Sequence, residues 1–182
     1  MKVHILIAAS LVAAACIATM PVHAQEVTVT KEAVDGISNF SRIQTTVACA
    51  GAIKPDAIPK IKEMGFVSII NLRLASEPGA DIAAEEAAAK GAGLRYYHIP
   101  FDGHAPDPAA VDAFLNAITE KGTEPAFIHC AGGNRAATMW FIKRLVVDHW
   151  DIDRAAKEAS ALGMTSPTLK QFAIDYSQTH KR

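Results

Sequence analysis

The chain has 182 residues, of which 50% are apolar and 20% charged, and its 18 basic side chains nearly balance its 19 acidic ones. This length and composition fit one globular domain and exclude a disordered or fibrous protein. The formal net charge of −1 gives no excess of cations for a phosphate backbone, so we expect no nucleic-acid partner. No apolar run after Pro21 reaches the roughly 18 residues that a membrane-spanning helix needs, so we expect no membrane span in the mature protein.

The first 24 residues have the plan of a secretory signal peptide. Lys2 precedes an almost wholly apolar stretch over residues 5–20, and Ala24 ends the segment with a small side chain. We therefore expect cleavage after Ala24 and export of the mature protein to the periplasm or outside the cell. Two other interpretations are less favoured. One is a buried N-terminal helix. The other is a lipoprotein attached through Cys16, against which Ala13 stands where a larger aliphatic residue is usual.

The chain after the expected cleavage site divides into two parts. Residues 25–38 are expected to form a loosely attached leader, and residues 39–182 a single folded domain without internal repeats or linkers. A domain of this size buries enough surface for a core without metal or disulfide staples. Only Cys49 and Cys130 remain after cleavage, which is not a disulfide framework.

Short apolar runs alternate with amphipathic segments after residue 40. The runs favour buried strands, and the segments between them show helical spacing and capping residues. Strands separated by helices of this length imply crossover connections. The sequence therefore predicts an α/β fold with a mostly parallel central sheet flanked by helices. The expected strands are 66–72, 94–99, 126–130 and a weaker 47–50, with 40–43 as its candidate partner; the expected helices are 57–64, 81–90, 108–121, 134–148, 153–162 and 167–179.

The segment that carries most chemical information begins where the strand 126–130 ends. Cys130 is followed by Gly132 and Gly133, and a helix is expected to begin near Asn134. The glycines allow successive backbone N–H groups to turn inward, and the positive end of the helix is directed at the same point. Arg135 adds a planar fork of donors that suits phosphate-like or sulfur oxyanions. We therefore predict an anion-binding loop.

The same loop provides a nucleophile. Helix N-termini and nearby cations stabilise the thiolate form of cysteine, so Cys130 is the expected catalytic residue, with Arg135 beside it. The alternative interpretation is a buried structural cysteine that happens to precede a glycine-rich turn. A nucleophile, backbone donors and an arginine within six residues favour the functional interpretation.

This segment resembles the phosphate-binding loop of cysteine-dependent protein phosphatases, His-Cys-x-x-Gly-x-x-Arg-Ser/Thr. His129, Cys130 and Gly133 match in place. Arg135 comes one residue early, and Ala136 stands where the phosphatases carry a hydroxyl that helps the thiolate leave. Both departures bear on whether the loop turns over a phosphate ester.

A closer resemblance is to the phosphatase-like domain of the beta-lactamase-hydrolase-like proteins, a branch with a shortened His-Cys-x-x-Gly-x-Arg loop. It covers about residues 39–180, including the stretches 39–42, 69–73 and 99–101 and the cysteine loop. The resemblance implies the cysteine-phosphatase α/β fold and a phosphatase-like domain over 39–182. It also implies hydrolysis of phosphate esters through a Cys130 thiophosphate. The substrate-binding residues would be Ala131, Gly132, Gly133, Asn134 and Arg73.

Two other functions remain open. The loop is also similar to that of single-domain rhodaneses, and a loop one residue shorter encloses less space, which suits a lone sulfur better than a phosphoryl group. Cys130 would then carry a persulfide as a sulfurtransferase. The third possibility is an oxyanion-binding module that kept the fold and lost turnover, which Ala136 and the missing loop residue are compatible with.

A phosphatase also needs a general acid, and two aspartates are candidates. Asp102 lies 28 residues before Cys130, directly after Pro-Phe, and is favoured. Asp107 precedes Pro108 and is expected to cap a helix. A third alternative, given as much weight as Asp102, is that neither aspartate is the general acid. A sulfurtransferase would need no such acid, and His104 beside Asp102 is expected to be an exposed loop residue.

The remaining candidates have supporting roles. By resemblance, His129 would hydrogen-bond backbone and brace the loop, and Arg73 would either guide an anionic substrate or form an ion pair with Glu77 or Asp81. Cys49 is either a packed thiol or a disulfide partner of Cys130. No histidine has metal-ligand spacing with a cysteine, so we expect neither metal nor cofactor. The expected partners are a small anionic or phosphorylated substrate and, in an oxidising compartment, a thiol reductant.

Overall fold

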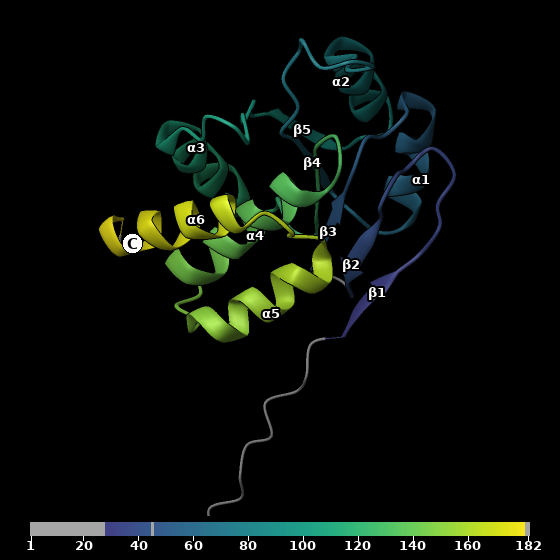
Figure 1. Cartoon of the computed structure of the whole chain (residues 1–182). Coiled ribbons are helices and arrows are strands. Elements are labelled where there is room, and N and C mark those ends of the chain that lie inside the picture. Colours follow the sequence, from purple (N-terminus) through teal and green to yellow (C-terminus); the bar gives the residue numbers. More distant parts are fainter. Residues whose placement is uncertain (1–27, 45, 181–182) are drawn as a thin grey trace, which may run out of the picture.

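The computed structural model describes residues 28–44 and 46–180 (Figure 1). The expected signal peptide, with Ala24 and Cys16, lies outside the described residues. Within them, six strands form one sheet in the order β1-β2-β3-β6-β4-β5. The strands are β1 (Val29–Lys31), β2 (Ser41–Ile43), β3 (Val47–Ala50), β4 (Ser68–Asn71), β5 (Arg95–His98) and β6 (Ala126–His129).

The sheet is mixed but mostly parallel. Strands β3, β6, β4 and β5 run parallel to one another, whereas β1 and β2 add two antiparallel strands at one edge. Strand β6 lies between β3 and β4, and all four of its residues are buried, as expected for an apolar run covered on both faces. In register, Ile128 of β6 lies opposite Cys49 of β3 and Ile70 of β4. The predicted α/β fold is confirmed.

The helices begin and end close to where the sequence predicts. Asp81, Asp107, Asp151 and Ser166 each accept a hydrogen bond from a backbone N–H of the first turn, which satisfies one of the orphan donors there. The helices are the 3₁₀ turn η1 (Pro55–Ala57), α1 (Ile58–Glu63), α2 (Ile82–Gly91), α3 (Pro108–Thr119), α4 (Asn134–Val146), α5 (Ile152–Leu162) and α6 (Pro167–Thr179).

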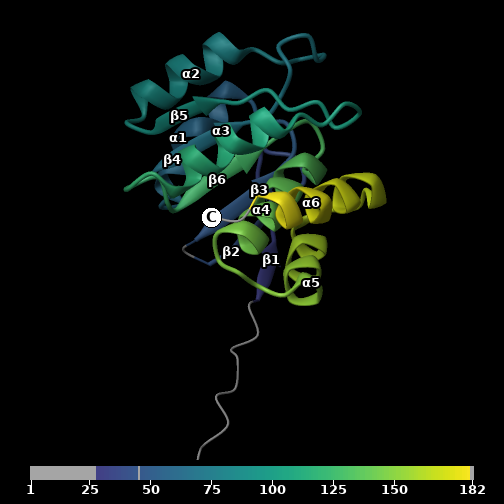
Figure 2. The same cartoon turned by 90° about the vertical axis from the view of Figure 1, so that its left-hand side faces the viewer.

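Helices cover both faces of the sheet (Figures 1 and 2). Helices α3, α4, α5 and α6 lie over one face, around the fully buried Trp140, Phe114 and Phe141. Helices α1 and α2 lie over the other face, around Phe127 and Ile61. Since α4 continues directly from β6, the loop between them opens at the edge of the sheet where the parallel strands end.

One sequence expectation needs correction at the N-terminal edge. Residues 25–38 were expected to form a loosely attached leader, but Val29–Lys31 pair with β2 and the side chain of Ile37 is only 7% exposed. A three-residue strand is too short to show a period of two in the sequence, which is why the pattern did not reveal it. Among the described residues, no helix is both long and apolar enough to cross a membrane.

Candidate active site

Cys130 is the first residue after β6, at the edge where the parallel strands end. Its side chain is 1% exposed, and its backbone N–H donates to the Ala50 carbonyl at 3.2 Å. Residues 131–133 then turn into α4. Gly133 has a φ of 97°, a left-handed conformation that glycine adopts without a Cβ clash. The sulfur thus lies at the N-terminal end of a 13-residue helix.

The turn directs a donor at the sulfur. The Gly133 N–H donates to Cys130 Sγ at 3.1 Å. A backbone N–H at a helix N-terminus favours a negatively charged partner, whether a thiolate or the oxygen of a bound anion. The loop therefore has the polarity that an anion site needs.

The loop is held from three directions. The Ala131 carbonyl accepts from Ala52 N–H at 2.9 Å, and the Gly132 carbonyl accepts from Asn39 Nδ2 at 3.1 Å. Asn134 Oδ1 accepts from the backbone N–H of Thr165 at 2.7 Å and of Ser166 at 3.1 Å. These bonds fix the carbonyls away from the sulfur, so the N–H groups of the same peptides are left for the site.

Gly51, directly after β3, lets this end of the strand approach the cysteine loop closely. A Cβ on Gly51 would lie 2.5 Å from Ser38 Oγ and 2.9 Å from the Ala131 carbonyl oxygen. Both distances are shorter than real Cβ contacts. The loop position therefore depends on the missing side chain at residue 51.

Arg135, in the first turn of α4, binds Glu77 and two main-chain carbonyls. Glu77 Oε1 lies 2.7 Å from Nη1 and Glu77 Oε2 lies 2.9 Å from Nη2. Nη1 also donates to the carbonyls of Leu72 at 3.2 Å and Phe101 at 2.8 Å. These contacts pin the guanidinium between the segments that follow β4 and β5.

The ionisation of the pair follows from these contacts. Burial alone raises the pKa of Glu77, but the hydrogen bonds from Arg135 and the Leu74 N–H and the charge of Arg135 outweigh burial and lower that pKa from 4.5 to about 2. Burial alone lowers the pKa of Arg135, whereas Glu77 and the nearby Cys130 raise it above its ordinary value. Both groups are therefore charged at neutral pH.

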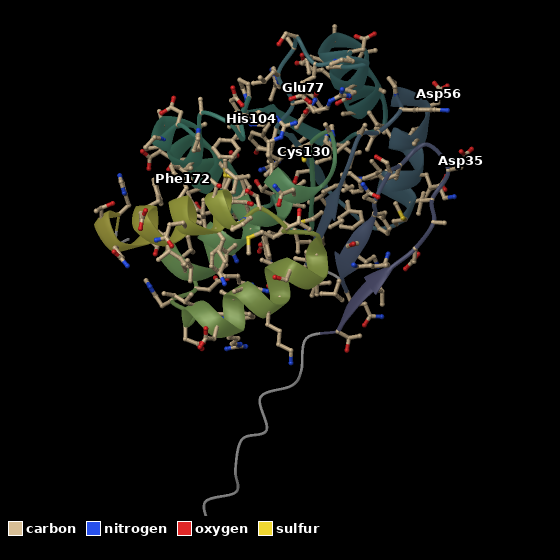
Figure 3. All side chains as sticks on the ribbon, in the orientation of Figure 1. Asp35, Asp56, Glu77, His104, Cys130 and Phe172 are labelled. Atoms are coloured by element: carbon tan, nitrogen blue, oxygen red, sulfur yellow. The ribbon has the colours of Figure 1, made fainter. Side chains whose placement is uncertain are left out.

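A cavity of about 590 Å³ brings most of the predicted site residues together. Cys130, Arg135 and Asp102 line it, together with Glu77 and His104. Figure 3 shows Glu77, His104 and Cys130 on the same side of the molecule. The other lining residues are Leu74, Gly103, Ala131, Gly132, Asn134, Ser166, Thr168 and Leu169. The cavity has a thiol, a guanidinium and carboxyl groups on its wall, and groups of these kinds can carry out phosphoryl transfer through cysteine.

The two candidate acids lie in different places. Asp102 faces the cavity, where its Oδ1 accepts from the His104 N–H at 2.8 Å. Asp107 lies outside the cavity lining and accepts from the Ala109 N–H at 2.9 Å as the cap of α3. Of the two aspartates, only Asp102 lines the cavity that Cys130 also lines.

The sequence also identifies the family. A model of the phosphatase-like domain of the beta-lactamase hydrolase-like proteins matches residues 39–147. The chain belongs to this family. A beta-lactamase hydrolase-like protein of Xylella fastidiosa is 34% identical over an alignment of 141 residues that covers 72% of this chain and 32% of that protein. The chain spans about a third or less of the length of the curated relatives it matches.

Solved structures share the phosphatase fold. A proposed phosphatase (DUF442) from Shewanella putrefaciens superposes with a TM-score of 0.68 at 20% identity, over 81% of this chain and 96% of that one. The core catalytic domain of the PP-IP phosphatase SIW14 from S. cerevisiae gives 0.63 at 17% identity, over 78% and 87%. TpbA from P. aeruginosa gives 0.60 at 21% identity, over 83% and 90%, and a variant of TpbA was crystallised with phosphotyrosine.

In this phosphatase-like domain Arg73 is placed away from the cavity. It is 2% exposed, and its guanidinium donates to the carbonyls of Pro78 at 2.6 Å and Gly79 at 2.9 Å and lies 3.4 Å from Glu77. Of the two roles considered for Arg73, these contacts correspond to the ion pair with Glu77. Arg73 thus shapes the 73–79 loop that presents Glu77 to Arg135.

The role expected for His129 needs correction. His129 is fully buried and faces α2, where its Nε2 lies 3.2 Å from Glu85 Oε2, and within the described residues neither ring nitrogen meets the geometry of a hydrogen bond. It therefore does not brace the loop through backbone. The same carboxylate accepts from Asn71 Nδ2 at 2.7 Å and from the Tyr96 hydroxyl at 3.2 Å, forming a buried polar cluster behind the loop.

The side chain of Asn134, which was expected to bind substrate, is held by another part of the chain. The Asn134 side-chain oxygen accepts hydrogen bonds from the α5–α6 connection, so it is not available to a substrate.

Cys49 and Cys130 are both buried free thiols. Burial, with the charges of Cys130 and Glu158, raises the pKa of Cys49, which corresponds to a packed thiol. Among residues 28–44 and 46–180, no cluster of three or more histidine, cysteine or acidic side chains is placed to hold a metal ion.

Sequence reasoning missed Glu77 as a site residue and Glu85 altogether. Glu77 was considered only as a partner of Arg73, because nothing in the sequence tells which of two arginines a loop carboxylate will meet. Glu85 is hidden in an alanine- and glutamate-rich helix whose hydrophobic face is weak. The one signal for it is a glutamate in the first turn of a helix that packs beside the strand ending in His129.

Proposed function

We propose that this chain is an exported, cysteine-dependent phosphatase that hydrolyses phosphate monoesters through a Cys130 thiophosphate. The observation that carries the proposal is that Cys130 and Arg135, from the β6–α4 connection, and Asp102, from the segment after β5, line one cavity at the N-terminus of α4. Membership of the phosphatase-like family supports it, as does the phosphotyrosine bound by a variant of TpbA, a protein of similar fold.

The first step would transfer the phosphoryl group to sulfur. The Cys130 thiolate attacks phosphorus, so the P–S bond forms while the bond from phosphorus to the leaving oxygen breaks. Asp102, in its protonated form, gives its proton to that oxygen and is left as a carboxylate. The loop N–H groups and Arg135 stabilise the negative charge on the transferring oxygens.

The second step would release phosphate. A water molecule attacks phosphorus, the Asp102 carboxylate takes its proton, and the P–S bond breaks to return the thiolate. In the phosphatases a hydroxyl after the arginine assists this departure, and here the fully buried Ala136 occupies that position. The Gly133 N–H, at 3.1 Å from the sulfur, would carry that stabilisation instead.

Hydrolysis of 4-nitrophenyl phosphate by the mature chain under reducing conditions tests the proposal. We expect turnover that is abolished in Cys130→Ser and that leaves a phosphorylated Cys130 detectable by intact mass in Asp102→Asn. Cys49→Ser, which removes the second buried thiol, is the matched control and retains turnover. Absence of turnover in the wild type, or turnover that survives Cys130→Ser, refutes the proposal.

A sulfurtransferase is the second candidate, favoured by the loop of four residues between Cys130 and Arg135. The Cys130 thiolate would then attack the outer sulfur of thiosulfate, forming a persulfide and releasing sulfite, and cyanide would take that sulfur as thiocyanate and return the thiolate, without help from Asp102. Intact mass after thiosulfate treatment distinguishes the two functions. If neither chemistry occurs but oxyanions raise the melting temperature, the chain is an oxyanion-binding module.

Export is part of the proposal and is tested separately. We expect the mature protein to begin at Gln25, to fractionate with the periplasm or the medium, and to need a thiol reductant that keeps Cys130 reduced. N-terminal sequencing of the protein purified from its own cells checks this. An intact Met1 in the cytoplasm contradicts it.

A further inference from the structure

The charges on the cavity wall suggest which phosphate esters the site accepts. Among the described residues that line the cavity, Arg135 is the one lysine or arginine, whereas Glu77 and Asp102 are acidic. Sites that bind several phosphoryl groups need several cations, because each group brings up to two negative charges. This cavity supplies one.

Most of the hydrogen-bond donors of the Arg135 guanidinium already have partners within the protein. Its Nη1 contacts Glu77 and the carbonyls of Leu72 and Phe101, and its Nη2 contacts the other Glu77 oxygen. The guanidinium also hydrogen-bonds the Cys130 side chain. With these partners in place, it has donors left for one phosphoryl group bound beside the sulfur and not for several.

The surroundings add no excess of positive charge. On the other side of the loop, a larger cavity of about 830 Å³ shares Gly132 and Asn134 with the first one. Glu32 and Asp35 line it against a single cation, Lys31. Further phosphoryl groups on a ligand bound at Cys130 would therefore find no cluster of cations among the described lining residues on either side of the loop, and carboxyl groups on both sides.

We propose that the site accepts a single phosphoryl group on an uncharged or positively charged leaving group, and that it rejects polyphosphorylated small molecules. This inference rests on the proposed phosphatase activity. Like charges held in a cleft repel a ligand more strongly than they do in open water, because the cleft walls focus the field. The chain would thus differ in specificity from a fold neighbour that is named as a PP-IP phosphatase.

The test compares kcat/KM on phosphotyrosine peptides that differ only in their flanks, lysine in one and glutamate in the other, with 4-nitrophenyl phosphate and inositol hexakisphosphate alongside. We expect the lysine-flanked peptide to exceed the glutamate-flanked one by about tenfold at low salt, with the ratio shrinking towards one at about 0.5 M salt. Inositol hexakisphosphate should release no phosphate. Equal kcat/KM values for the two peptides overturn the inference. So does phosphate release from inositol hexakisphosphate at the rate seen with 4-nitrophenyl phosphate.

A charge-adding variant and its control sharpen the result. Thr168 is exposed and lines the cavity, whereas Thr119 is exposed and does not. Thr168→Lys should raise kcat/KM for the glutamate-flanked peptide several-fold relative to the lysine-flanked one, and Thr119→Lys should leave that ratio unchanged. If both variants shift the ratio equally, the preference comes from net charge and not from the cavity, which overturns the inference.

Failure of the inference and failure of the proposed function give different results. Turnover of 4-nitrophenyl phosphate without any charge preference overturns only the inference. No turnover of any substrate overturns the proposed function. Peptide affinities measured on Cys130→Ser then still read the charge preference of the cavity, and equal affinities refute that preference on their own.

Discussion

Glu77 and Arg135 are 58 residues apart in the sequence and meet through two contacts, of 2.7 and 2.9 Å, at the mouth of the cavity that holds Cys130. Glu77 belongs to the loop after β4, and Arg135 to the first turn of α4. The carboxylate holds the two Nη atoms of a guanidinium that also hydrogen-bonds the Cys130 side chain. The pair therefore decides how Arg135 is oriented before a substrate arrives.

Replacement of Glu77 by glutamine should weaken turnover through this orientation. A hydrogen bond to a charged group is worth about 1.5–3 kcal/mol, so we expect kcat/KM for 4-nitrophenyl phosphate to fall about 10- to 100-fold in Glu77→Gln. Glu120→Gln, which removes the same charge from an exposed ion pair with Arg95, is the control and should change little. Equal effects of the two substitutions would show that Glu77 does not orient Arg135.

The same pair predicts how stability depends on pH. The pKa of Glu77 is about 2 in the folded chain against an ordinary 4.5, so the folded state favours the ionised carboxylate. Its contribution is fully present above about pH 4.5 and is lost as pH falls towards 2. The difference in free energy of unfolding between wild type and Glu77→Gln should therefore be constant from pH 7 to 5 and shrink from pH 5 to 3. Denaturant titrations at each pH measure it, and a difference that stays constant down to pH 3 contradicts the assignment.

Asp102 should matter most when the leaving group is poor. An alkyl phosphate needs a proton on its departing oxygen, whereas 4-nitrophenolate leaves well without one. We expect Asp102→Asn to lower kcat about 100-fold or more for an alkyl phosphate, and clearly less for 4-nitrophenyl phosphate. Asp107→Asn is the matched control, because asparagine caps a helix as well as aspartate does. A loss in Asp102→Asn that is the same for both leaving groups would remove Asp102 as the acid.

The sequence predicted the scaffold of the site better than its side-chain partners. The apolar run before Cys130 and the two glycines after it predict a strand, a turn and a helix, because these depend on local chemistry along a dozen residues. The pairing of Glu77 with Arg135 depends on two loops from different strand ends meeting in space. His129 shows the same limit of sequence reasoning. The period of a strand predicts that its side chain points to the other face of the sheet from that of Cys130, but it does not predict the contact with Glu85 of α2.

The buried cluster behind the loop should contribute strongly to stability. Glu85 is 1% exposed, lies 3.2 Å from His129 Nε2 and accepts from Asn71 and Tyr96. Glu85→Ala leaves these groups without their shared acceptor, so we expect a loss of about 3–5 kcal/mol in the free energy of unfolding. Glu86→Ala, at the next and exposed position of α2, should stay within about 0.5 kcal/mol of wild type. Chemical denaturation of the two variants checks this, and equal losses would mean that the cluster is not a unit.

Gly51 tests whether the loop position controls activity. An added Cβ would meet the Ala131 carbonyl at 2.9 Å, and that oxygen belongs to the backbone of the cysteine loop, so the loop has to move. We expect Gly51→Ala to cost about 1–3 kcal/mol of stability and to lower kcat for 4-nitrophenyl phosphate more than it raises KM. Gly91→Ala is the control: a Cβ there meets nothing within 4 Å, and alanine favours a helix over glycine by about 0.5–1 kcal/mol. Were Gly51→Ala to lose stability but keep full kcat, the packing at residue 51 would support the fold without setting the geometry around Cys130.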